Sequence, residues 1–286
     1  MNYIPSLFSD MWAMSEDRHA GLMSLILPSI QAGRFDEVEE YLKKAQTESY
    51  ASDVNFAVRW DLADTQLPYD SIAVLFLSGE LYSWSTEMVS SDINLAMANE
   101  RIIGIILVIN GPGGMITGLD TLADKISTSE KPVVSYISGM AESAHYWIAS
   151  ATQKRFLASR MCEVGSVGIV GVYRNYKKYF EMQGIDYRTI YPEGADLKNY
   201  ASRQIEENND EGPYREKLQK LHEFFCQTVS KNLKIPYDKE SPVFRGDTFM
   251  GDDAIAVGLA DGYSTLDGAA RWLLAQKVKN QANSLF

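Results

Sequence analysis

Residues 138–151, SGMAESAHYWIASA, hold a glutamate, a histidine and three serines, at positions 138, 143 and 150. A serine, a histidine and an acid can serve as nucleophile, general base and orienting group of a hydrolase. The spacing argues against that triad, because His145 stands two positions from Ser143 and such side chains on a helix do not face each other. Glu142 adjoins Ser143 and cannot orient a histidine there, and the local sequence lacks the GxSxG pattern of α/β-hydrolases. Ser143 is a candidate nucleophile without a histidine partner, and Ser138 is expected to end a strand.

A lysine is the alternative base, and Lys198 lies in a loop that contains glycine and aspartate, YPEGADLKNY. To accept a proton near neutral pH, the pKa of a lysine must fall from about 10.4 to about 7–8, and burial beside a serine shifts it that way. Residue type alone leaves two plainer interpretations open, with Lys198 as a solvated surface lysine and Ser143 as a helix N-cap. The other histidines, His19 and His222, fall in amphipathic helical patterns away from the glycine- and serine-rich segments.

Two glycine-rich segments could supply backbone N–H groups to a reaction. They are NGPGGMITG at 110–118 and GSVGIVG at 165–171. The first lacks the GK[ST] ending of a P-loop and the GxGxxG order of a dinucleotide site. Adjacent glycines allow unusual φ values and close backbone approach, and N–H groups there suit a developing oxyanion. A tight strand–helix turn is the plainer interpretation of the same residues.

The elements that must position these residues follow from four apolar, β-rich runs. They are 72–77, 102–109, 132–137 and 155–158. Nearly continuous apolar character is typical of strands covered on both faces, and separations of roughly 25–30 residues fit βαβ units. The pattern predicts an α/β fold with a mostly parallel sheet and right-handed crossovers. Sites in such folds gather at the carboxyl ends of strands, where the first glycine segment and Ser143 both fall.

Helical periodicity predicts the remaining elements. Residues 10–45 are helical in pattern and a polar break follows, so 1–55 is interpreted as a helical N-terminal arm and 56–286 as the main domain. The clearest amphipathic helix covers 212–234, where a core face and a partner-binding face are both open interpretations. Further helices are predicted around Ile116, Leu119, Leu122, Ala123 and Ile126, and over 254–261 and 266–276.

The composition excludes some classes of function. A net charge of −11 over 286 residues repels a phosphate backbone, so nucleic acid is not an expected partner. The start of the chain shows neither a signal-peptide pattern nor an apolar run long enough for a bilayer, so a cytoplasmic protein without a membrane anchor is expected. Cys162 and Cys226 stand outside metal-ligand spacings, and we expect reduced, buried thiols, no metal and no other cofactor.

In order and spacing, these segments resemble the signal peptide peptidase A family of serine proteases, over about residues 70–270. The family includes the phage capsid assembly proteases and belongs to the Clp protease/crotonase superfamily. The matching segments are IAVLFLSGEL, NGPGG, MAESAHYWIAS, GSVGIVG and FRGDTFMGDDAIAVGLAD. They stand where the family has its first core strand, an Asn/Asp–Ser/Thr–Pro–Gly–Gly turn, an Ala–Ser–Gly–Gly–Tyr helix start, a Gly–Ser–Ile–Gly–Val segment and its closing Gly-Leu-Val/Ala-Asp segment. The resemblance implies a Clp protease/crotonase-like fold.

The resemblance also implies roles for individual residues. It aligns Ser143 with the nucleophile, Lys198 with the general base, and Ser166 with a serine that helps hold the lysine. The oxyanion hole would comprise the N–H groups of Gly114 and Ala144, with Gly113 assisting.

Three positions depart from the family pattern. Gly111 replaces the Ser/Thr before the proline, and Ala144 and His145 replace the two glycines after the nucleophile. Ala144 still supplies an N–H group. His145 is bulkier than glycine and is expected to narrow the substrate groove, which concerns specificity more than chemistry.

The function implied is that of a serine endopeptidase with a Ser–Lys dyad. The phage branch implies cleavage of scaffold or capsid proteins during head assembly, in the host cytoplasm, by a homo-oligomer whose neighbouring subunits complete the sites. Three alternatives stay open: a bacterial peptidase of the signal-peptide-peptidase type that degrades peptides, a non-catalytic assembly protein on the same fold, and crotonase-like acyl-CoA chemistry, which rests on fold analogy alone.

Overall fold

The computed structural model describes residues 54–186 and 188–283. Nearly all of the predicted N-terminal arm, residues 1–53, lies outside the described residues. The chain divides into two compact units. Among the described residues, one unit comprises 54–167 and 229–283, and the other is Gly168–Thr228.

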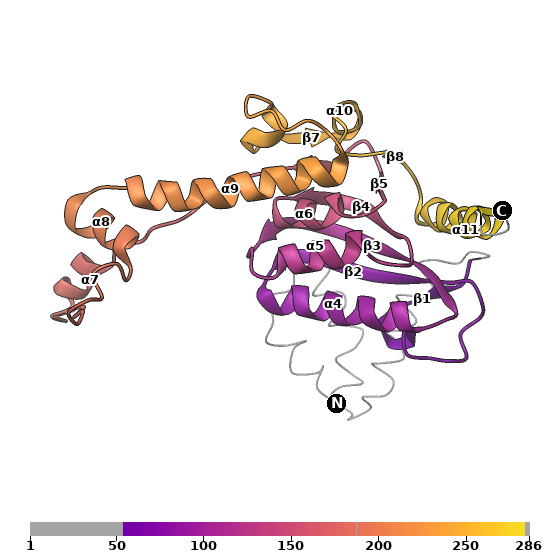
Figure 1. Ribbon diagram of the computed structural model, residues 1–286, viewed down its shortest axis with the longest axis horizontal. Helices are drawn as coiled ribbons and strands as arrows, with labels where there is room; N and C mark the ends of the chain where they lie inside the picture. The colour runs from indigo at the N-terminus through magenta and orange to yellow at the C-terminus, as the bar shows by residue number, and fades with distance from the viewer. Residues whose placement is uncertain (1–53, 187, 284–286) are drawn as a thin grey trace, which may run out of the picture. The chain divides into compact units, whose positions relative to one another are not determined.

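The first unit is built on a sheet that has eight strands within the described residues (Figure 1). The strands are β1 Phe56–Ala57, β2 Ser71–Leu81, β3 Ile102–Gly114, β4 Val133–Glu142, β5 Lys154–Leu157, β6 Glu163–Gly165, β7 Thr248–Met250 and β8 Gly262–Tyr263. The main order is β1-β2-β3-β4-β5-β8, and β6 extends the sheet beside the end of β4. All pairs are parallel except β6 with β7. The predicted α/β architecture with a mostly parallel sheet is confirmed.

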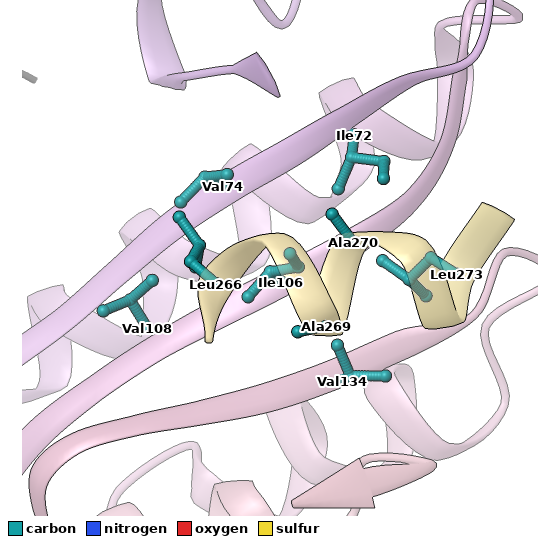
Figure 2. Packing of buried hydrophobic residues seen from close by; sticks show 9 residues of the cluster. All are labelled: Ile72, Val74, Ile106, Val108, Val134, Leu266, Ala269, Ala270 and Leu273. Atoms are coloured by element: carbon teal, nitrogen blue, oxygen red, sulfur yellow. The ribbon is translucent and has the colours of Figure 1, made fainter. Parts of the chain in front are cut away.

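Helices cover both faces of this sheet. The helical segments are η1 Arg59–Asp61, α4 Ser83–Ala98, α5 Leu119–Ser127, α6 Ala144–Ser150, η2 Pro242–Arg245, α10 Gly251–Ala256 and α11 Leu266–Asn283. Successive side chains of a strand point to opposite faces. On one face Val74 and Ile106 pack against Leu273 and its neighbours on α11 (Figure 2). Leu75 and Ile105, the strand neighbours of Val74 and Ile106, are also buried. They lie on the opposite face of the sheet, which α4, α5 and α6 cover.

The second unit contains α7 Lys177–Met182, α8 Tyr200–Asn208 and most of α9 Gly212–Leu233. Gly171 lies against α9, since a Cβ atom there would come within 2.7 Å of the Tyr214 ring. Several large apolar side chains of this unit are exposed, among them Val170 and Ile190.

Element boundaries differ from the sequence expectations where polar residues or glycines continue a strand. The four predicted strands are all present, but β3 runs on to Gly114 and β4 to Glu142, so Ser138 lies inside a strand and does not end it. The 212–234 helix is confirmed as α9, and α11 contains the predicted 266–276 helix. Ile116 is outside α5 and 40% exposed. The helix predicted over 254–261 ends at Ala256.

Candidate active site

Ser143 occupies a strained junction between β4 and α6. Its φ of 52° and ψ of −119° lie in a region that residues with a Cβ atom seldom adopt. Such a conformation costs about 1–3 kcal/mol and persists only where the surroundings enforce it. Here the Ser143 N–H donates to the Gly165 carbonyl at 2.9 Å, and the Ser143 carbonyl accepts the Trp147 N–H at 2.9 Å. Backbone strain held in this way is frequent at catalytic positions.

The helix that follows Ser143 is firmly anchored. All seven residues of α6 are buried. The Tyr146 hydroxyl donates to the Leu259 carbonyl at 2.8 Å, and this bond ties α6 to the chain segment before β8. The position of Ser143 is therefore fixed by buried structure on its C-terminal side and by the β4–β6 pairing on its N-terminal side.

The Ser143 hydroxyl is not used as a helix cap. Ser143 stands at the N-cap position of α6, yet its side chain makes no capping hydrogen bond. The residue is half-buried. The N-cap interpretation therefore accounts for the position of Ser143 but gives no role to its hydroxyl.

The NGPGG segment lies directly against Ser143. A Cβ atom on Gly113 would stand 2.8 Å from the Ser143 Cβ and 3.2 Å from its Oγ. Gly114 is pressed against β2, since a Cβ atom there would stand 2.2 Å from the Leu81 carbonyl oxygen. Both glycines have positive φ, 113° and 149°. The segment is an extension of β3 and not the expected tight turn, and only glycine fits at these two positions.

Asn110 joins this segment to the strand that carries Ser143, a role that the sequence did not indicate. Its Oδ1 accepts the Met140 N–H at 3.1 Å across β3 and β4. Gly139 leaves room for the amide, because a Cβ atom there would lie 2.4 Å from that same oxygen. This hydrogen bond holds the ends of β3 and β4 together, close in sequence to Ser143.

His145 is fully buried and bonded to the glycine segment. Its Nδ1 accepts the Gly113 N–H at 3.0 Å. Burial lowers the pKa of His145 to about 4, so the ring is neutral at pH 7. Because Nδ1 is occupied by a backbone N–H, the ring cannot take a proton from Ser143. The structure therefore differs from two expectations: the ring lies in the interior and presents no surface to a groove, and the Gly113 N–H points to His145 and not to an oxyanion.

Ser166 and Ala144 lie next to Ser143 in the same unit. Ser166 follows the Gly165 carbonyl that holds Ser143, has a φ of 52° itself, and donates its N–H to the Asp247 carbonyl at 2.8 Å. Ala144 is the first residue of α6, where helix N–H groups have no intrahelical acceptor.

Lys198 belongs to the second unit, Gly168–Thr228. It is exposed, in a turn just before α8, and its N–H donates to the Ala195 carbonyl at 3.1 Å. Residues 188–190, which precede this loop, have no regular structure.

The other candidate groups have different surroundings. His222 contacts Cys226 along α9, with 3.5 Å between Nε2 and Sγ, and burial raises the pKa of that thiol to about 11. Cys162 and Cys226 are both buried and not in disulfides. His19 lies outside the described residues.

The acidic residue next to Ser143 is partly withdrawn from solvent. The pKa of Glu142 is raised by burial and by Glu163. In the described part of the chain, no group of His, Cys, Asp or Glu side chains is arranged to hold a metal ion.

Comparison with known families decides the identity. The sequence profile of peptidase family S49 matches residues 125–280, more than half of the chain, and the Clp protease profile matches 65–164. The chain belongs to peptidase family S49. The S49 match includes Ser143 and Lys198, and the two profiles together cover every strand of the first unit's sheet except β1. The sheet has the Clp protease-like fold.

Relatives of this S49 peptidase include proteases from phage and bacteria. Capsid assembly protease C of Escherichia phage lambda is 27% identical over 67% of this chain and 46% of its own length. Protease 4 of Salmonella typhi is 25% identical over 70% of this chain and 33% of its own length. The chain thus spans less than half the length of either relative. A mutant of the 1510-N membrane-bound stomatin-specific protease aligns with a TM-score of 0.48 at 14% identity, over 70% of this chain and 83% of that one. No helix in the described part of this S49 peptidase is long and apolar enough to cross a bilayer.

Proposed function

We propose that this chain is a serine endopeptidase in which Ser143 is the nucleophile and Lys198 the general base. The observation that carries the proposal is the conformation of Ser143, a half-buried residue held at φ 52° with an uncapped hydroxyl beside the Gly113 backbone. A serine needs an adjacent base to become a nucleophile, and His145 cannot serve because its acceptor nitrogen is occupied. Membership of an S49 peptidase family and the sequence position of Lys198 support the lysine for that role.

The reaction then runs in two steps. Lys198 takes the hydroxyl proton as Ser143 Oγ attacks the peptide carbonyl carbon, and the N–H groups of Gly114 and Ala144 donate to the resulting oxyanion. The ammonium of Lys198 returns the proton to the leaving amine, so an acyl-enzyme and a free amino terminus are formed. Water, deprotonated by Lys198, attacks the ester carbonyl, and the lysine ammonium then returns that proton to Ser143 Oγ as the ester C–O bond breaks and the acid is released. Ser166 holds the lysine in reach of the serine.

The pairing of Ser143 with Lys198 can occur within one chain or between neighbours in a homo-oligomer. Mixing Ser143→Ala protein with Lys198→Ala protein distinguishes the two. Recovered cleavage in the mixture means that a lysine serves the serine of another subunit, whereas an inactive mixture means pairing within one chain.

The substrates that we propose are phage scaffold or capsid proteins, because a capsid assembly protease is among the relatives. A peptide-degrading role is the alternative that the likeness to Protease 4 favours. The test is mass spectrometry of new protein termini in host cells that express the wild-type chain or Ser143→Ala. Termini that depend on Ser143 and fall in capsid or scaffold proteins support the assembly role. Ser143-dependent peptides from many proteins support the degradative role, and identical termini in both strains contradict a serine peptidase.

A further inference from the structure

We propose that His145 is a positioning residue, whose Nδ1 holds the Gly111–Gly114 segment against Ser143 by accepting the Gly113 N–H. It thereby leaves the N–H groups of Gly114 and Ala144 as the oxyanion donors. The inference deepens the proposed function and rests on Ser143 as the nucleophile.

The ring of His145 fills the space that a side chain at position 111 would need. A Cβ atom on Gly111 would stand 2.2 Å from the ring Cε1, 2.4 Å from Nε2 and 2.5 Å from the Gly79 carbonyl oxygen. Contacts below 3.0 Å are essentially never seen for real Cβ atoms, so any other residue at 111 requires both the ring and the Gly79 backbone to move. Gly111 and His145 are two of the three positions at which this chain departs from the S49-like motif. They are therefore one coupled departure, in which the ring replaces the side chain missing at Gly111.

The hydrogen bond shows why the ring is an imidazole and not an apolar group. A neutral ring that accepts at Nδ1 carries its proton on Nε2. That Nε2 is buried and has no hydrogen-bond partner among the described residues. A buried, unpaired donor lowers stability, whereas an apolar side chain of similar size would fill the same space without that cost. What the imidazole adds is the Nδ1 acceptor, 3.0 Å from the Gly113 nitrogen.

The bond acts at the point where the glycine segment touches the nucleophile. Gly113 contacts Ser143 through its Cα side, with its N–H turned to His145. If the acceptor is removed, the Gly113 N–H is left buried without a partner, and the positive-φ glycine can rotate to find one. Gly114 would move with it, and oxyanion donors act only within about 2.7–3.1 Å of the oxygen. The expected effect is on kcat and on the reactivity of Ser143, with KM little changed.

Two substitutions at His145 separate the acceptor from the bulk. In His145→Asn the amide Oδ1 is bonded to Cγ as Nδ1 is in histidine, so the acceptor is kept; in His145→Leu a side chain of similar size has none. Labelling of Ser143 by a fluorophosphonate, kcat and KM for a peptide ester, and Tm are measured for both. We expect His145→Leu to label and turn over about 10- to 100-fold more slowly with KM within about 2-fold, and His145→Asn to recover most of the loss. Wild-type rates in His145→Leu, or equal losses in both variants at equal Tm, would overturn the inference.

A double-mutant cycle in thermal stability tests, independently of activity, whether the His145 ring occupies the space beside Gly111. Gly111→Ala is expected to lower Tm by about 5 °C or more with His145 present and by a clearly smaller amount in a His145→Ala background, where only the contact with the Gly79 carbonyl oxygen remains. If Gly111→Ala does not fold, recovery of folded protein in the double variant has the same meaning. Additive effects would contradict the coupling. If wild-type protein folds but is not labelled at Ser143, the proposed function fails, while this cycle still decides whether His145 and Gly111 form a pair.

Discussion

The backbone N–H of Ser143 donates to the carbonyl of Gly165 at 2.9 Å, and this bond joins the proposed nucleophile to the strand that leads to Ser166. Gly165 has a φ of 124°, and a Cβ atom on it would stand 2.6 Å from the Asp247 carbonyl oxygen. The peptide group that accepts the Ser143 N–H is thus fixed by close contact between the backbones of Gly165 and Asp247. This contact leaves no space for a side chain at position 165.

Gly165→Ala should therefore destabilise the protein and misplace Ser143. We expect a loss of about 2 kcal/mol or more in the free energy of unfolding, from positive-φ strain plus the backbone clash. Urea unfolding and fluorophosphonate labelling measure the two effects. Gly246→Ala is the matched control, because its φ of 87° carries a similar strain while a Cβ atom meets nothing within 4 Å. Equal losses of stability and labelling in the two variants would show that the contact with Asp247 has no particular role.

The strain at Ser143 predicts that two inactive variants of this residue differ in stability. Ser143→Gly and Ser143→Ala both remove the hydroxyl, but only glycine relaxes at φ 52°. We expect Ser143→Gly to exceed Ser143→Ala by about 1 kcal/mol in the free energy of unfolding, measured in urea at pH 7. A Ser143→Gly protein less stable than Ser143→Ala would mean that the conformation is not strained.

Acid should destabilise the fold through His145. Its pKa is about 4 in the folded protein, against about 6.5 when unfolded, so the unfolded chain binds more protons between these values. Stability then rises with pH across this window and is lost as pH falls from 6.5 to 4, by about 3 kcal/mol in all. Glu142 contributes with the opposite sign, since its folded pKa is raised.

Comparison of wild-type protein with His145→Asn isolates this contribution, because Glu142 is common to both. The free energy of unfolding is measured in urea at several values between pH 4 and pH 7. The difference between the two proteins should shrink or reverse toward pH 4. Parallel curves over the whole window would be incompatible with a buried neutral imidazole.

The sequence predicted the sheet well, and the reason lies in the burial of its strands. Val74, Leu75 and Ile106 are all interior because helices cover both faces, and so the strands are nearly continuous apolar runs. The strand ends were missed since Asn110 and Glu80, and the glycines beside them, carry no apolar signal. Their extended conformation comes from pairing such as Glu80 with Gly113, which is long-range in sequence.

The site was predictable as a set of residue types but not as a geometry. Ser143 could be singled out by its place after a strand, whereas its positive φ is imposed by Gly165 and Gly113, which are distant in sequence. His145 was expected at a groove because it is larger than glycine. Its burial depends on the space left at Gly111, and nothing local to either residue indicates that they meet.

The most direct test of the central claim is a fluorophosphonate adduct mapped by mass spectrometry on the 286-residue chain. The account predicts one adduct, on Ser143, that is lost in Ser143→Ala and reduced at least about 100-fold in rate in Lys198→Ala. Lys178→Ala, which removes another exposed lysine of the same unit, should label at the wild-type rate. An adduct on a different serine, or undiminished labelling of Ser143 in folded Lys198→Ala protein, would contradict the Ser–Lys dyad.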